Sequence, residues 1–103
     1  MHWVFLTFFF GGAFLANALP HIGNGVSGRP FPTPFASPPG KGLSSATINV
    51  LWGFFNLGMA YLLIVRIGDF DLRNLAHVAL VAAGMLLMAL LSARIFGRLH
   101  GGQ

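Results

Sequence analysis

The stretch INVLWGFFNLGMAYLLIV, residues 48–65, decides the fold because its eighteen consecutive residues include no charged side chain. As an α-helix rising about 1.5 Å per residue it is about 27 Å long, close to the bilayer hydrocarbon core of about 30 Å. A lone segment in lipid must satisfy its own backbone hydrogen bonds, which a helix does. Ser44 and Ser45 precede the run as N-cap candidates and Arg66 ends it, which predicts a transmembrane helix over residues 48–66.

The composition of the whole chain agrees with a lipid environment. Its 103 residues are enough for one domain, with 55% hydrophobic and only 8% charged residues, whereas soluble domains carry about 25% charged residues. The net charge is +4, and the basic residues stand at the ends of apolar runs, where they suit lipid phosphates better than nucleic acid. The absence of cysteine excludes disulfides and thiolate metal sites. We therefore expect one membrane domain over residues 1–103, with membrane lipids as partners and no nucleic-acid partner.

Two further apolar runs flank this stretch. The first is closed by Pro20, and the last follows the connector RIGDFDLRN, which holds both acidic residues of the chain. An alternative for the first run is a secretory signal peptide cleaved after residues 16–18, but no Lys or Arg precedes it, which favours a retained span. We expect an all-α membrane protein with three transmembrane helices, at residues 3–19, 48–66 and 74–94, and a long Pro/Gly-rich loop between the first two, at residues 20–47.

Three spans place the chain ends on opposite sides of the membrane. One side then holds the N-terminus and the short connector, with two basic residues, and the other holds the long loop and the C-terminus, with four. Because basic residues are enriched in cytoplasmic loops, this bias predicts an integral membrane protein with its N-terminus outside and its C-terminus inside. The first side carries Arg66 and Arg73, and the second carries Arg29, Lys41, Arg94 and Arg98.

The long loop is unusual in its proline content, because five of its residues between positions 29 and 39 are prolines. Proline fixes φ and favours a polyproline II path of about 3.1 Å per residue, so residues 29–39 can reach about 34 Å across the end of the bundle. Phe31 and Phe35 then serve as interfacial anchors. We expect a stiff strap at this end, and the alternative is a lid over a polar site.

A polar site is expected beside this strap, where the second helix begins. A helix N-terminus carries a partial positive charge and free N–H groups, which attract anions. The segment PPGKGLSS lacks the spacing of a phosphate-binding P-loop, so a lipid headgroup is the expected anion. The residues predicted to bind an anion or a lipid are His21, Asn24, Arg29, Lys41, Ser44 and Ser45.

Polar and small residues recur on one face of the second helix. Residues of this kind inside a bilayer normally face other helices, so they either hold helices together or line a pore in an oligomer. No acidic residue lies within a span, which argues against a proton-coupled carrier. We expect no catalytic group, and lean against an enzyme. The packing or pore-lining candidates are Asn17, Asn49, Gly53 and Asn56.

Four histidines raise the question of a metal or haem site. His2 and His77 fall on the side of the N-terminus, and His21 and His100 fall on the other side. No two of them stand at the i, i+4 spacing that helical metal ligands use. We therefore expect no metal and no cofactor.

The segments ANALPHIGNGVSGRPFPTPF and PGKGLSSATINVLWGFFN resemble a group of small, uncharacterised bacterial integral membrane proteins with no known activity. The resemblance covers about 40 of the residues and implies that the long loop and its flanking helix ends are the distinctive part of the chain. The matching residues are Ala16, Asn17, Pro20, His21, Gly25, Gly28, Thr33, Pro34, Phe35, Ser44, Ser45, Asn49, Val50, Trp52, Gly53 and Asn56.

Three functions remain open at this point. The first is a structural or accessory membrane protein that forms a homo-oligomer or joins a larger membrane complex, and small size and small-residue helix faces support it. The second is an oligomeric channel or carrier lined by Asn49 and Asn56. The third is an anionic lipid or ligand binder at residues 20–47.

Overall fold

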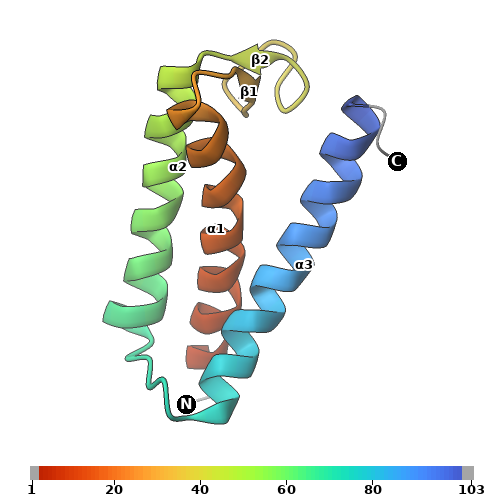
Figure 1. Cartoon of the computed structure of the whole chain (residues 1–103). Coiled ribbons are helices and arrows are strands. Elements are labelled where there is room, and N and C mark those ends of the chain that lie inside the picture. Colours follow the sequence, from red (N-terminus) through yellow and green to blue (C-terminus); the bar gives the residue numbers. More distant parts are fainter. Residues whose placement is uncertain (1–2, 101–103) are drawn as a thin grey trace.

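Three long helices, capped at one end by a two-stranded ribbon, make up the computed structural model, which describes residues 3–100 (Figure 1). Each of the three is long and apolar enough to cross a membrane, counting the second helix together with the π-helical turn that continues it. The prediction of three membrane-spanning helices is confirmed to that extent. The elements are α1 (Trp3–Val26), β1 (Phe31–Pro32), β2 (Leu43–Ser44), α2 (Ala46–Tyr61), its continuation η1 (Leu62–Ile67) and α3 (Leu75–Leu99).

The first helix does not end at residue 19, as the sequence predicts, but passes through Pro20 to Val26. Proline removes one backbone donor, a loss that membrane helices tolerate when neighbouring groups hold the backbone in place. Here Asn24 Nδ2 donates to the Pro20 carbonyl at 2.8 Å. Gly25 packs directly on α2, since a Cβ atom there would lie 2.5 Å from Val50 Cγ2. Tertiary contacts therefore keep the last turns of α1 helical.

The predicted long loop is also wrong in its extent and its path. The segment between α1 and α2 is shorter than residues 20–47 and folds back on itself, because β1 pairs antiparallel with β2, with Phe31 opposite Ser44. Gly40 adopts the left-handed φ of +74° that the reversal requires, and its N–H donates to the Thr33 carbonyl at 2.8 Å. The prolines thus sit in a hydrogen-bonded ribbon and turn, not in an extended polyproline strap.

The other helix ends are set by local capping. Ser45 accepts a hydrogen bond from the Ile48 N–H at 3.2 Å, so α2 begins at Ala46 and the predicted serine cap is confirmed. Asn74 caps α3 in the same way through the N–H groups of residues 76 and 77. The last helix continues five residues beyond the predicted end at residue 94, to Leu99.

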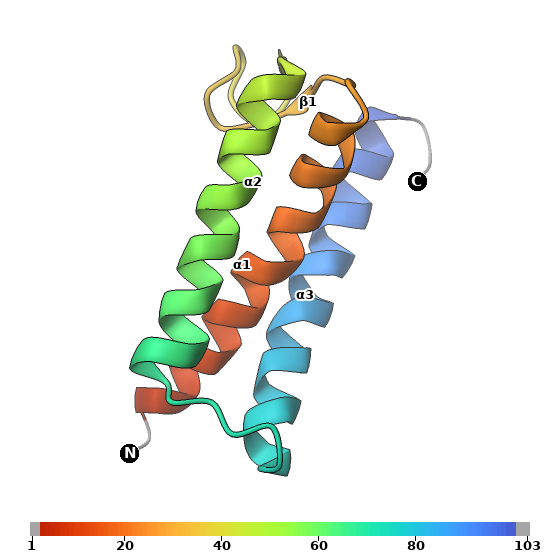
Figure 2. The ribbon, with the colours of Figure 1, turned by 60° about the vertical axis from the view of Figure 1, so that its left-hand side comes forward.

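Helix α1 lies between α2 and α3 and packs against both (Figure 2), and in the view of Figure 1 α3 slants away from them toward the capped end. The contact between α1 and α3 depends on two glycines. A Cβ atom on Gly84 would overlap the carbonyl oxygen of Phe9, and a Cβ atom on Gly12 would overlap that of Val81. This backbone approach is the close packing that small residues allow between membrane helices.

Candidate functional site

The centre of the capped end is Asn49, whose side chain is fully buried. Its amide nitrogen Nδ2 donates to the carbonyl oxygens of Phe31 at 3.0 Å, Ser44 at 3.2 Å and Ser45 at 3.0 Å. Its oxygen Oδ1 lies 2.7 Å from His21 Nδ1. One side chain therefore ties both strands of the ribbon and the end of α1 to the first turn of α2.

These contacts also fix the state of His21. Because the amide nitrogen of Asn49 faces three carbonyl oxygens, its Oδ1 faces the imidazole and can only accept a hydrogen bond. The proton of that bond lies on His21 Nδ1, which leaves Nε2 without a proton in the neutral ring. His21 is only 2% exposed, and the rings of Phe31 and Trp52 lie 5.4 and 6.4 Å from its centre. It is held as a structural group between helix and ribbon.

A second polar layer lies two helical turns along α2. Asn17 Nδ2 donates to Asn56 Oδ1 at 3.1 Å, and Asn56 Nδ2 donates to the Trp52 carbonyl at 2.8 Å. Between the two layers Gly53 faces α1, where a Cβ atom would lie 2.5 Å from Ile22 Cγ1. The four packing or pore-lining candidates thus lie along the seam between α1 and α2 with their hydrogen bonds made inside the chain. This geometry favours helix packing over a pore lining.

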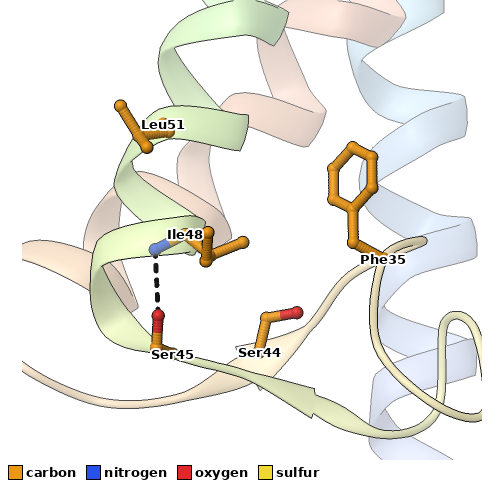
Figure 3. A pocket seen from close by; sticks show the side chains of 5 residues that line it. All are labelled: Phe35, Ser44, Ser45, Ile48 and Leu51. Atoms are coloured by element: carbon orange, nitrogen blue, oxygen red, sulfur yellow. Dashed lines mark hydrogen bonds between the residues drawn. The ribbon is translucent and has the colours of Figure 1, made fainter.

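A hollow of about 420 Å³ lies at the start of α2 (Figure 3). Its wall is mostly apolar, and the two serines in it already have partners within the chain. Ser45 accepts from the Ile48 N–H, as the dashed line in Figure 3 shows. Ser44 Oγ forms a hydrogen bond with Thr33 Oγ1. The lining residues are Phe35, Ser44, Ser45, Ile48 and Leu51.

The six residues predicted to bind an anion do not form one site. His21, Ser44 and Ser45 meet around Asn49, which bonds to the His21 ring and to the backbone carbonyls of the two serines. Asn24 accepts instead from Arg29 Nε at 3.2 Å, near the end of α1.

Lys41 lines a different hollow from Ser44 and Ser45, together with Arg98 on the last turns of α3. Sequence reasoning missed this neighbour, because the contact depends on how the ribbon folds back toward α3. The sequence alone predicts that Lys41 and Arg98 lie on the same side of the membrane, but it does not predict that they line one hollow.

The histidines near the ends also make local contacts. His77 Nδ1 accepts from the Asp71 N–H at 3.0 Å, and its ring lies 4.3 Å from that of Phe8. The ring of His100 lies 6.0 Å from that of Phe31. Across residues 3–100, no three His, Cys, Asp or Glu side chains come close enough to hold a metal ion together. His2 lies outside the described residues.

Comparison of the chain with models of protein families, with curated proteins and with solved structures finds no match. The resemblance to small bacterial membrane proteins therefore remains a prediction, and the functional argument stands on the geometry.

Proposed function

We propose that the protein is a small structural or accessory subunit of a bacterial inner membrane, which associates with copies of itself or with a larger membrane complex. The observation that carries the proposal is the exposure of α3. In its most apolar stretch of eighteen residues only 6% are buried, against 28% in α1, although α3 is the most hydrophobic of the three helices. Gly84 is the one α3 residue that is buried.

One stripe of the exposed surface of α3 carries small residues. Membrane helices associate through van der Waals contact and hydrogen bonds, and small residues let their backbones approach closely. Alanines at positions 82 and 89 are exposed and lie seven residues apart, on one face of α3. A second membrane helix packed along this stripe would cover a face of α3 that its contact with α1 leaves exposed.

The channel or carrier alternative receives less support from the geometry. Asn49 and Asn56 are 0% and 1% exposed and bond to groups of the same chain. If Asn49 and Asn56 lined a path through an oligomer, their side-chain hydrogen bonds within the chain would have to break. The proposal keeps the N-terminus outside and the capped end in the cytoplasm, on the basis of the four basic residues at the capped end.

Single-cysteine cross-linking in native membranes tests the association, since the chain has no cysteine of its own. Ala82→Cys and Ala89→Cys on α3 are expected to give cross-linked dimers, or cross-links to a partner subunit. The matched control is Leu51→Cys, at an exposed position on α2, which is expected to stay uncross-linked. Equal cross-linking from both helices would indicate random collision. A monomeric native mass in lipid nanodiscs, with no cross-link from α3, would also contradict the proposal.

A further inference from the structure

A hollow of about 390 Å³ lies between the turn of the ribbon and the last turns of α3. It is separate from the hollow at the start of α2, because the two share no lining residue. Two of its lining side chains are cationic and two are aliphatic. They are Lys41, Ile95, Arg98 and Leu99.

The position of Lys41 against α3 is set by contacts on both sides of the turn. The ring of Phe31 in β1 lies 4.6 Å from that of Phe96, which fastens the ribbon to the end of α3. Within the turn, the N–H groups of Lys41 and Gly42 donate to the Pro38 carbonyl at 3.1 and 2.7 Å. The fold itself thus places Lys41 and Arg98 so that both cations border the same hollow without a ligand.

The charge of this hollow is not neutralised by the part of the chain that the structure describes. Neither Lys41 nor Arg98 forms an ion pair among residues 3–100. The acidic side chains of the sequence are Asp69 and Asp71, in the connector at the opposite end of the bundle. Two cations facing one hollow without a carboxylate favour an anion there.

The depth of the hollow in the membrane indicates which anion. The uncharged part of α3, residues 75–93, is about 28 Å long at about 1.5 Å per residue, close to the thickness of a bilayer core. Arg98 therefore lies just beyond the core, among lipid phosphates. Ile95, which is 51% exposed and lies about one turn nearer the core than Arg98, supplies apolar surface for the first carbons of an acyl chain.

We propose that this hollow binds the headgroup of an anionic phospholipid. The planar guanidinium of Arg98 suits two phosphate oxygens, and the Lys41 ammonium adds a second positive charge to the same phosphate. Ile95 contacts the glycerol end of the acyl chains, and Leu99 borders the headgroup on the outer side of the hollow. The site goes beyond the proposed subunit role and does not depend on it, since all four lining residues belong to one chain.

Native mass spectrometry of protein released from phosphatidylcholine nanodiscs doped with phosphatidylglycerol tests the site. Lys41→Gln and Arg98→Gln should each lower retention of phosphatidylglycerol about fivefold, which corresponds to about 1 kcal/mol per cation. Arg98→Lys keeps the charge but loses the paired N–H groups, so its retention of phosphatidylglycerol should lie between those of the wild type and Arg98→Gln. The matched control is Arg29→Gln, which removes one charge at the same end of the bundle but from a residue bonded to Asn24.

The outcomes separate a built site from general surface charge. Lower retention of phosphatidylglycerol in both Lys41→Gln and Arg98→Gln, with unchanged retention in Arg29→Gln, supports the proposal. Equal loss in all three variants, or unchanged retention in all three, overturns it. A further arm adds soluble glycerol 3-phosphate at constant ionic strength: displacement of the lipid by this headgroup alone would identify a free phosphate ligand and overturn the lipid assignment. Far-UV circular dichroism checks that the variants keep their helices, as these exposed positions predict.

Discussion

Replacement of Asn49 by alanine should destabilise the protein more than any other single loss of a polar side chain at the capped end. The change removes the two amide N–H groups, which are shared among three carbonyl oxygens, and the oxygen that accepts from His21. Because Asn49 is fully buried, water cannot take over these bonds in the native structure.

The size of the effect follows from the number of bonds. Side-chain hydrogen bonds contribute about 0.6 kcal/mol each in membrane proteins and about 1 kcal/mol in general, so two donors and one acceptor give about 2–3 kcal/mol. The His21 N–H also loses its acceptor while buried, which places the expected value in the upper half of that range. His21→Phe breaks only the bond to Asn49 Oδ1 and should cost less.

The free energy of unfolding, measured by SDS titration in mixed micelles with circular dichroism as the signal, gives the test. Hydrogen exchange adds a local readout, because the ribbon at residues 31–44 should lose protection in Asn49→Ala. The matched control is Asn24→Ala, whose side chain is half-buried and bonds only to Pro20 and Arg29. If Asn49→Ala unfolds at the same SDS fraction as the wild type and its ribbon stays protected, the proposed role of this network is refuted.

Two glycine pairs give further predictions, each measured as the free energy of unfolding by the same titration. Gly84→Ala places a Cβ atom against the Phe9 carbonyl and should cost about 1–3 kcal/mol through overpacking. Its control is Gly58→Ala on α2, where the added Cβ atom meets nothing within 4 Å, so this change should be neutral or stabilising. Equal effects of the two changes would contradict the close approach of α1 and α3. Gly40→Ala forces a side chain into φ of +74° and should cost about 1–2 kcal/mol, while Gly23→Ala, in α1 with open space around it, should stabilise by up to about 1 kcal/mol. A harmless Gly40→Ala would refute the turn as described.

The membrane helices could be predicted from the sequence because each depends on a local property, the length of an uncharged run. The C-terminal end of α1 could not, since Pro20 is a helix-ending signal that contacts within α1 and with α2 override. Asn24 bonds back to the Pro20 carbonyl and His21 to Asn49, so the chain stays helical to Val26. Helix propensity alone carries no information about these partners.

The residues that α2 contributes to the candidate site could be predicted from the sequence, but the groups that they contact could not. The spacing of Asn49 and Asn56 places both on one helix face, and both face α1 in the structure. That Asn49 also binds the Phe31 carbonyl depends on the ribbon folding back over the helix ends. The pairing of Lys41 with Arg98 depends on the same fold, and the proline content of the segment pointed instead to an extended strap.

The most direct test of the central claim, a three-span membrane protein with its ribbon in the cytoplasm, is cysteine labelling of intact cells. Ser27 follows α1 at the capped end, Leu72 lies in the connector at the other end, and both are exposed. A membrane-impermeant maleimide should label Leu72→Cys in intact cells and Ser27→Cys only after the inner membrane is permeabilised. Labelling of both positions from the same side would contradict the three spans, and labelling in the reverse order would contradict the orientation.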